Sequence, residues 1–362
     1  MGTETLEIRE NYPLRDITTF GIGGPARYFA AAHNEAHVRE ACAFARENRI
    51  PLLVLGGGSN ILVSDTGFPG LVILNRIKGF NSRTRGQYVF VTAGAGEDWD
   101  SFVKRCVENG WQGLECLSGI PGTVGAAPVQ NIGAYGQSVD ACISEVRAVD
   151  VHTGGEVSLS SNECGFEYRK SIFNSQSAGR YIITQVTFRL VPEGVPELTY
   201  HDLKKHFPDD SAVTPAKVRN AVLEVRNGKG LLILEGYESF KSAGSFFKNP
   251  VISAGQFEKV NEIIQKEGCG ANWAWPRRSG DIKVSAACLI QCAGYTRGHR
   301  QGNVGLSPKH TLVIINHHDA AAAEVIAFAR QVQGKVREKF GVLIEPEVRL
   351  AGFAPDALPL QK

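Results

Sequence analysis

The sequence predicts a mixed α+β fold with short helices. Apolar residues recur at helical spacing in segments such as 35–48, while short apolar runs such as Leu-Leu-Val-Leu at 52–55 are typical of buried strands. Glycine-rich stretches separate these segments at irregular intervals. A length of 362 residues favours two or three domains and is sufficient for a sizeable core.

The first half of the chain alternates between the two kinds of segment. Turn residues open 11–32 and lead into a Tyr-Phe strand, and Asn34 is placed as the N-cap of a helix over 35–48. Further strands are expected at 52–55, 71–74, 88–92, 146–151 and 181–190, and a helix is expected at 98–109 with Gly110 as its C-cap.

The second half follows a shift in composition at 191–196, Val-Pro-Glu-Gly-Val-Pro, which indicates a domain boundary. Helices are expected at 215–226, 254–266, 285–292 and 319–339, with a strand at 311–315 and a closing strand at 342–350. On such a closing strand Glu347 and Arg349 would point to one face.

Charge and composition exclude several classes of partner. Lys plus Arg is 39 and Asp plus Glu is 37, and the net charge of +2 with no long basic run gives no indication of nucleic-acid binding. The polar, acidic N-terminus is not typical of a signal peptide, and no apolar segment is long enough to span a bilayer. The eight scattered cysteines are expected to be reduced and mostly buried, which favours a cytoplasmic protein.

The stretch 118–136, SGIPGTVGAAPVQNIGAYG, is the most informative loop. It holds five glycines and no charged residue, and its apolar residues argue against disorder. Loops of this length are usually functional or disordered, and glycine lets a ligand approach the backbone closely. An uncharged glycine loop can bind phosphate through convergent N–H groups. Cofactor binding is the favoured interpretation, and an ordinary surface loop is the alternative.

The standard nucleotide-binding signatures are absent. Neither the glycines near Gly21 nor those near Gly94 match G-x-G-x-x-G, and Lys229 between two glycines lacks the rest of a P-loop. Gly-Gly-Gly-Ser-Asn at 56–60 follows a buried strand and can present N–H groups to a diphosphate, although a tight turn fits equally well.

Three further motifs carry chemistry, each with a structural alternative. Ser245 in Ala-Gly-Ser-Phe-Phe-Lys-Asn-Pro, 243–250, is either an exposed catalytic hydroxyl or part of a turn over two buried aromatics. Glu347 and Arg349 in Glu-Pro-Glu-Val-Arg, 345–349, are more often a structural ion pair. Arg169 in Tyr-Arg-Lys-Ser suits bidentate carboxylate recognition, though a lone arginine is usually a surface residue.

Taken in order, GGGSN, IPGTVGAAPVQNIGAYG, YRKSIF, AGSFFKNP and EPEVR resemble the UDP-N-acetylenolpyruvoylglucosamine reductase family, flavoenzymes of bacterial cell-wall synthesis. The resemblance covers about 11–350. Residues 198–203, Leu-Thr-Tyr-His-Asp-Leu, resemble the substrate-capping tyrosine segment of one form of the family. Segments 191–210 and 231–240 read as variable, and the turn at 294–307 matches no family motif.

The resemblance implies a fold and a cofactor. It implies an FAD-binding domain of the vanillyl-alcohol-oxidase (PCMH) type at 11–193, made of two α+β subdomains at about 11–75 and 76–193. This domain is followed by a C-terminal α+β substrate-binding domain at 197–340. A closing strand at 341–355 then carries a catalytic glutamate back toward the flavin. FAD would be bound non-covalently, because no His or Cys lies in 118–140. The cofactor-binding residues would be Gly56, Gly57, Gly58, Ser59, Asn60, Ile120, Pro121, Gly122, Thr123, Gly125, Ala126, Gly133 and Tyr135.

The resemblance also implies the chemistry. NADPH reduces the flavin and leaves, and hydride then passes to the vinyl carbon of an enolpyruvyl ether. Ser245 would donate the proton to the α-carbon, while Arg169 and Glu347 would polarise the substrate carboxylate. The sugar nucleotide would be bound by Tyr168, Tyr200, Lys229, Asn249 and Arg349. The product serves peptidoglycan synthesis, and with it cell shape, cell cycle and cell division.

Two other functions stay open on the residues alone. A different FAD-dependent oxidase or dehydrogenase of the same fold, acting on an alcohol or hydroxy acid, would leave AGSFFKNP and EPEVR unexplained. A non-catalytic flavin- or nucleotide-binding regulator is disfavoured because Arg169, Ser245 and Glu347 are all present. The expected partners are a UDP-sugar and NADPH, with no nucleic acid, no metal and no membrane, and the chain is expected to be a monomer.

Overall fold

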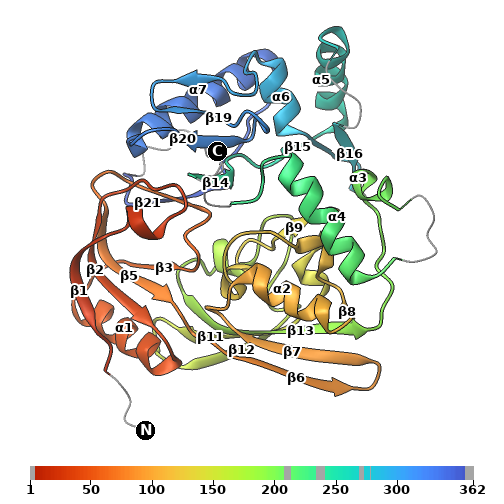
Figure 1. Cartoon of the computed structure of the whole chain (residues 1–362). Coiled ribbons are helices and arrows are strands. Elements are labelled where there is room, and N and C mark those ends of the chain that lie inside the picture. Colours follow the sequence, from red (N-terminus) through yellow and green to blue (C-terminus); the bar gives the residue numbers. More distant parts are fainter. Residues whose placement is uncertain (1–4, 208–212, 234–240, 269–272, 278, 355–362) are drawn as a thin grey trace. The chain divides into compact units, whose positions relative to one another are not determined.

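The computed structural model describes residues 5–207, 213–233, 241–268, 273–277 and 279–354. The chain forms two compact units (Figure 1). Unit 1 comprises Met1–Tyr12, Ala26–Gly58 and Phe68–Gly228, and unit 2 comprises Pro13–Pro25, Ser59–Gly67 and Lys229–Lys362. The chain thus passes from unit 1 to unit 2 between Gly58 and Ser59, inside the Gly-Gly-Gly-Ser-Asn motif.

Unit 1 begins with a four-stranded sheet in the order β1-β2-β5-β3. Strand β5 pairs in parallel with both β2 and β3. Helix α1 packs its apolar face on this sheet, where Val38, Ala41 and Cys42 are fully buried. Asn34 caps the helix by accepting a hydrogen bond from the N–H of His37. The bounds are β1 Ile8–Pro13, β2 Pro25–Ala32, α1 Glu35–Glu47, β3 Leu52–Leu55 and β5 Phe68–Asn75.

The second sheet of unit 1 is antiparallel and runs in the order β12-β11-β13-β7-β6, with β8 paired to β13. Helix α2 buries Trp99 and Phe102 against Phe188 of β13. Short elements and two helices complete the unit. The bounds are β6 Phe80–Arg85, β7 Tyr88–Gly94, α2 Trp99–Glu108, β8 Trp111–Gln112, β9 Gly133–Ala134, β10 Gln137–Ser138, β11 Ile143–Asp150, β12 Glu156–Ser160, β13 Tyr181–Pro192, α3 His201–Lys204 and α4 Pro215–Gly228.

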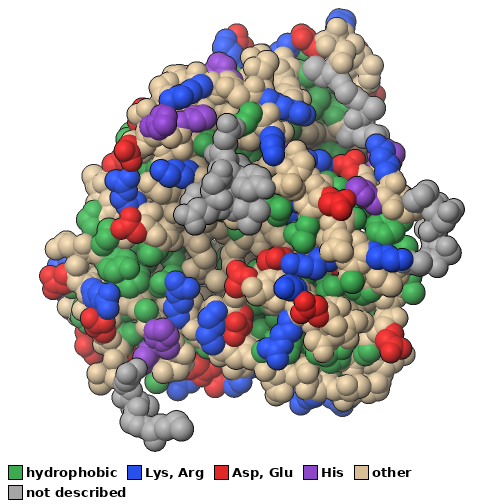
Figure 2. All heavy atoms as spheres, in the orientation of Figure 1, with side chains coloured by type: hydrophobic (Ala, Val, Ile, Leu, Met, Phe, Trp, Pro, Cys, Tyr) green, Lys and Arg blue, Asp and Glu red, His purple; other side chains and the backbone are tan. Residues whose placement is uncertain are grey.

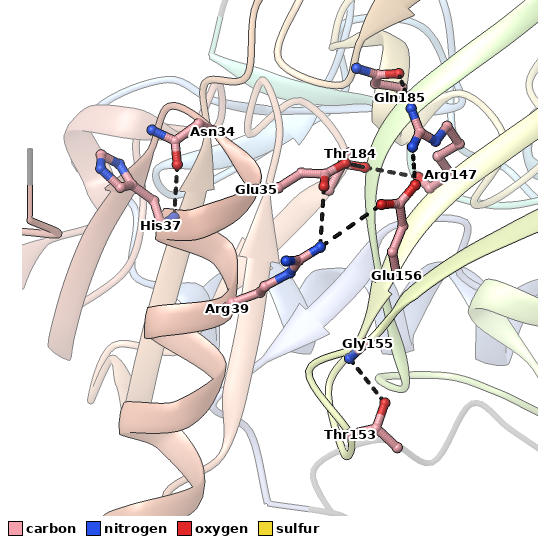
Figure 3. Close-up of polar contacts among 10 residues, drawn as sticks. All are labelled: Asn34, Glu35, His37, Arg39, Arg147, Thr153, Gly155, Glu156, Thr184 and Gln185. Atoms are coloured by element: carbon pink, nitrogen blue, oxygen red, sulfur yellow. Dashed lines mark hydrogen bonds and ion pairs between the residues drawn. The ribbon is translucent and has the colours of Figure 1, made fainter. Parts of the chain in front are cut away.

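Polar contacts join helix α1 to the second sheet (Figure 3). Glu35, in the first turn of α1, accepts a hydrogen bond of 3.0 Å from the hydroxyl of Thr184 on β13. Arg39, one turn later, pairs with Glu156 of β12 at 3.9 Å, and Glu156 also pairs with Arg147 of β11. These contacts fix the relation of the two sheets within unit 1, although exposed ion pairs of this kind contribute little stability individually.

Unit 2 contains two further sheets, ordered β14-β20-β19-β18 and β15-β17-β16, and a parallel pair of β21 and β4. Phe246, Phe247, Leu289 and Phe328 are fully buried in its core. Its bounds are β4 Ile61–Val63, β14 Ser242–Ser245, β15 Val251–Ile252, α5 Ala254–Lys266, β16 Ala274–Pro276, β17 Ile282–Val284, α6 Ala286–Cys292, β18 Arg300–Gln301, β19 Val304–Leu306, β20 Val313–Asn316, α7 Ala322–Phe340 and β21 Arg349–Ala351.

One predicted element is wrong. Residues 342–350 do not form a continuous strand, because only Arg349–Ala351 is extended in a ladder. Pro346 has no N–H to donate, and it makes an isolated bridge with Phe247. Val348 lies at a bend, and Glu347 is outside the strand that begins at Arg349. The prediction that Glu347 and Arg349 point to one face of a strand therefore does not hold.

The expected helix at 319–339 begins later, at Ala322, because Asp319 has a left-handed backbone with φ of 38° and the N-cap residue Ala321 is extended, with φ of −77° and ψ of 150°.

The cysteine prediction needs one correction. Cys42, Cys106, Cys116, Cys142, Cys164 and Cys288 are free thiols, as expected. Cys292, however, is disulfide-bonded. Cys269 lies outside the described residues, as do residues 208–210 and 234–240 of the two segments expected to be variable. Burial raises the pKa of the Cys42 thiol to about 11, so this group stays protonated and behaves as a small apolar side chain.

Among the described helices none is both long and apolar enough to cross a membrane. Figure 2 shows acidic and basic side chains interspersed on the face in view.

Candidate active site

The glycine loop at residues 118–136 is ordered by backbone hydrogen bonds in unit 1. It contains a 3-10 turn, Val124–Ala126, and ends in the β9–β10 hairpin. The N–H groups of Val124 and Gly125 donate to the carbonyls of Glu97 and Ala95 at 2.9 Å each. A Cβ on Gly125 would lie 2.5 Å from the Cβ of Ala95, so the loop approaches its support more closely than another residue would allow.

The two predicted cofactor loops contact each other. A Cβ on Gly57 would lie 2.9 Å from the Cα of Gly122, and a Cβ on Gly56 would collide with the hydroxyl of Thr123. Two segments far apart in the sequence therefore meet backbone to backbone. Within the described residues, neither the N–H of Gly57 nor that of Gly122 donates a hydrogen bond. This leaves two neighbouring N–H donors for an anion.

Arg169 lies against the far end of the same glycine loop. Its Nη2 donates to the carbonyl of Gly133 at 2.7 Å and its Nη1 to the carbonyl of Asn131 at 3.3 Å. The backbone of Arg169 is left-handed, with φ of 56°. Asn131 ties the two segments together, since its Nδ2 donates to the carbonyl of Glu167 at 3.0 Å. The structure thus brings Arg169 beside the predicted flavin loop and holds its guanidinium in a fixed position.

Tyr200 also meets the glycine loop. Its ring lies edge-on to that of Tyr135, with centroids 5.3 Å apart. A Cβ on Gly136 would collide with the hydroxyl of Thr199, which shows how closely the two segments approach. Tyr168, by contrast, is a partly exposed side chain next to the guanidinium of Arg169, whose Cζ lies 5.5 Å from its ring centroid.

In unit 2 the structure places the segment of Ser245 beside the segment of Glu347. The N–H of Glu347 donates to the carbonyl of Phe246 at 2.8 Å, and the N–H of Lys248 donates to the carbonyl of Glu345. Ser245 ends strand β14 directly before the buried Phe246. The motifs AGSFFKNP and EPEVR, about one hundred residues apart in the sequence, are therefore adjacent in space.

Asn60 joins the same cluster in unit 2. Its Nδ2 donates to the carbonyl of Glu347 at 3.2 Å, and its own carbonyl accepts from the N–H of Arg349 at 3.0 Å. Asn249 instead uses its Oδ1 to accept from the N–H of Ala286 at 3.0 Å, which is a structural role at the start of α6. Arg349 as a whole residue is exposed to solvent, but its guanidinium lies among neighbouring atoms, and this burial lowers its pKa.

Lys229 lies near His310, a residue that the sequence did not single out. Burial, Lys229 and Arg297 together lower the pKa of His310 from 6.5 to about 4. The imidazole is therefore neutral near pH 7, and its Nδ1 accepts from the N–H of Leu312 at 3.2 Å. A histidine in a segment without a recognised motif gave no signal in the sequence.

Three comparisons with known proteins place the chain. A family model described as "FAD binding domain" matches residues 26–160, and one described as "UDP-N-acetylenolpyruvoylglucosamine reductase, C-terminal domain" matches residues 236–351. A curated UDP-N-acetylenolpyruvoylglucosamine reductase from Thermobifida fusca is 39% identical over 96% of this chain and 99% of its own length. The one from Escherichia coli strain K12 is 38% identical over 94% of this chain and 96% of its own length.

A solved structure gives the same result. The crystal structure of UDP-N-acetylenolpyruvylglucosamine reductase (MurB) from Thermus caldophilus matches with a TM-score of 0.67 and 26% identity, over 96% of this chain and 99% of that one. The fold and these matches therefore define an FAD-dependent flavoprotein oxidoreductase, with the α+β fold class expected from the sequence. The chain belongs to the UDP-N-acetylenolpyruvoylglucosamine reductase family.

Proposed function

We propose that this chain reduces UDP-N-acetylglucosamine-enolpyruvate to UDP-N-acetylmuramate for peptidoglycan synthesis, with FAD as its cofactor and NADPH as the reductant. The observation that carries the proposal is the pairing of AGSFFKNP with EPEVR in unit 2. In that pairing the N–H of Glu347 donates to the carbonyl of Phe246, the residue directly after Ser245, whose hydroxyl is the candidate proton donor. A simple alcohol oxidase has no need for this arrangement.

The glycine segments of unit 1 fit the FAD diphosphate. The close contact of Gly57 with Gly122 leaves no room for a side chain at Gly57, and the N–H groups of the two glycines supply donors without adding charge. We assign the remaining glycines of 56–58, with Ser59, Asn60, Ile120, Pro121, Thr123, Gly125, Ala126, Gly133 and Tyr135, to the same cofactor. Bound FAD supplies the hydride that reduces the vinyl carbon of the substrate.

Arg169 acts on the substrate carboxylate. Negative charge develops there as the vinyl carbon is reduced, and a forked guanidinium stabilises that charge with two hydrogen bonds. The carbonyls of Gly133 and Asn131 already fix the guanidinium, so little reorganisation accompanies the reaction. Preorganised groups of this kind contribute about 3 kcal/mol of barrier each.

Ser245 delivers the proton to the α-carbon. A hydroxyl is a weak acid, but the developing carbanion is a strong base, so the transfer is favourable. Glu347 assists only while it carries or shares a proton, because a bare carboxylate would repel the developing charge.

The sugar nucleotide is bound in this proposal by Tyr168, Tyr200, Lys229, Asn249 and Arg349. We further propose that the protein works as a cytoplasmic monomer.

An anaerobic experiment on the purified protein tests the function. NADPH should bleach the flavin absorbance, and later addition of UDP-N-acetylglucosamine-enolpyruvate should restore it with formation of one equivalent of lactyl ether. A flavin that is reoxidised by a simple alcohol-derived carbonyl and not by the enolpyruvyl ether would support another oxidoreductase of the same fold. Failure of both additions to change the spectrum would support a non-catalytic protein.

A further inference from the structure

Helix α4 carries two buried arginines, Arg219 and Arg226, on one face. They are seven residues apart, which is two helical turns, and their exposed fractions are 9% and 8%. Arg219 forms a bidentate ion pair with Asp100, with Nη1 to Oδ1 at 2.6 Å and Nη2 to Oδ2 at 2.7 Å. Arg226 bonds to Tyr135 of the glycine loop and lies close enough to Asp100 to lower its pKa.

Asp100 also holds the start of the glycine loop. Its Oδ1 accepts the N–H of Gly119 at 2.5 Å, directly before the Ile-Pro-Gly segment assigned to the cofactor. Burial opposes ionisation of Asp100, but the bonds from Arg219 and Gly119 outweigh it and lower its pKa. Removal of Asp100 would leave the mostly buried guanidinium of Arg219 without its ion partner, and removal of Arg219 would leave a partly desolvated carboxylate.

The same helix packs against the segment that carries Tyr200. Leu203 from that segment and Val218 and Val222 from α4 are fully buried in one cluster with Cys116, which precedes the glycine loop. Tyr135 and Leu198 flank this cluster. Helices α2 and α4 lie side by side (Figure 1), so Asp100 and Arg219 form the polar link between them.

We propose that Asp100 and Arg219 are positioning residues for the reaction assigned above, on which this inference rests. The pair holds the glycine loop, through Gly119, in a fixed relation to helix α4 and the Tyr200 segment packed on it. Breaking the pair therefore weakens binding of FAD and of the sugar nucleotide together, while the chemical step in the saturated enzyme changes little.

Unit 1 provides a matched control pair. Like Asp100, Asp150 combines an arginine partner with backbone N–H donors. It accepts from the N–H groups of His152 and Thr153, where Asp100 accepts from Gly119, and its Oδ2 lies 2.8 Å from the Nε of Arg180. Asp150 ends β11 and Arg180 directly precedes β13, and within the described residues their hydrogen bonds do not involve the glycine loop. Asp150→Asn and Arg180→Met thus remove an Asp–Arg pair, with a more exposed arginine than Arg219, without touching the proposed coupling.

The experiment compares Arg219→Met, Arg219→Lys, Asp100→Asn and the double variant Asp100→Asn/Arg219→Met with the two control variants in the full-length protein. The readouts are unfolding temperature, FAD Kd of the apoprotein, and KM and kcat for UDP-N-acetylglucosamine-enolpyruvate. We expect Arg219→Met to raise both FAD Kd and KM about tenfold, with kcat changed by less than about threefold. Arg219→Lys and Asp100→Asn, which keep a charge or the acceptor for Gly119, should show smaller increases.

The control variants should lose stability but keep FAD Kd and KM within about twofold of wild type. If Asp100 and Arg219 serve stability alone, their variants should also lose stability and keep FAD Kd and KM near wild type. That outcome would overturn the proposal. Arg219→Lys and Asp100→Asn keep the test decisive if Arg219→Met does not fold. A wild-type protein that binds no FAD or does not reduce the enolpyruvyl ether would overturn the proposed function and this inference together, whereas unaffected variants of an active wild type overturn the inference alone.

Discussion

Replacing Gly57 with alanine tests whether the contact between the two glycine segments serves flavin binding. The new Cβ would lie 2.9 Å from the Cα of Gly122 and 3.3 Å from its carbonyl carbon. Carbon atoms in ordinary contact lie about 3.5–4.0 Å apart, so one segment must move by roughly half an ångström. Both sides of the contact are backbone, so no side-chain rotation relieves it.

The size of the effect follows from the cost of overpacking. Extra methyl groups in well-packed sites cost about 1–3 kcal/mol. If the apoprotein relieves this strain by letting the segments separate, the full cost appears when FAD draws them together again. The expected increase in FAD Kd is then about 5- to 150-fold. Unfolding of the apoprotein should change less than FAD binding.

Gly56→Ala offers a matched comparison, because its new Cβ meets a side chain instead of backbone. The hydroxyl of Thr123 is the obstructing atom, and the next contacts, with the Cβ atoms of Thr123 and Ala126, are at 3.4 and 3.5 Å. Adding Thr123→Ala should therefore return Gly56→Ala to the FAD affinity of Thr123→Ala alone. The same second change should not rescue Gly57→Ala. Titration of apoprotein with FAD, followed by flavin fluorescence, measures each Kd. Wild-type affinity in a folded Gly57→Ala protein would refute the reasoning.

Three other predictions address separate groups. Gly122→Asp, at a φ of 127° that disfavours a side chain, adds a negative charge beside the diphosphate, and the purified protein should be largely colourless; a fully yellow preparation would count against the loop assignment. Arg169→Ala should leave flavin reduction by NADPH nearly intact and slow reoxidation by the enolpyruvyl ether about 10²-fold or more in stopped flow; equal losses in both steps would exclude its assigned role. His310, with its pKa lowered from 6.5 to about 4, binds a proton between those pH values only when the chain unfolds. Stability should therefore fall as pH drops through that window, by up to about 3 kcal/mol, and His310→Gln should flatten this slope in urea titrations.

Local signals in the sequence predicted the longer helices and the longer strands, and most of the two- to six-residue strands were not predicted. Asn34 before an amphipathic segment marks the start of α1 at Glu35, as found. The segment 254–266 matches helix α5, which Ser253 caps through the N–H of Gln256. In both cases the deciding interactions lie within a few residues. Local sequence did not predict β1, nor the interruption at Pro346, because these depend on which distant segment supplies the partner.

The site could be predicted only where a motif marked it. Ser245 and Glu347 were identified from the family resemblance, and the hydrogen bond that joins their segments became visible only in the structure. The pairing of Asp100 with Arg219 could not be predicted, because in the sequence each is an ordinary charged residue of a helical segment. Their pairing spans more than one hundred residues, and no periodicity or spacing connects such positions.

A single-turnover reaction in D2O tests the central claim most directly. Enzyme reduced with NADPH is mixed anaerobically with UDP-N-acetylglucosamine-enolpyruvate, and the lactyl product is analysed by NMR. In wild type, solvent deuterium should enter the α-carbon on one face. In Ser245→Ala, with FAD content preserved, the reaction should slow about 10²- to 10⁴-fold or lose its stereochemistry, because the positioned proton donor is gone. Near wild-type rate with one clean stereochemistry in Ser245→Ala would contradict the account.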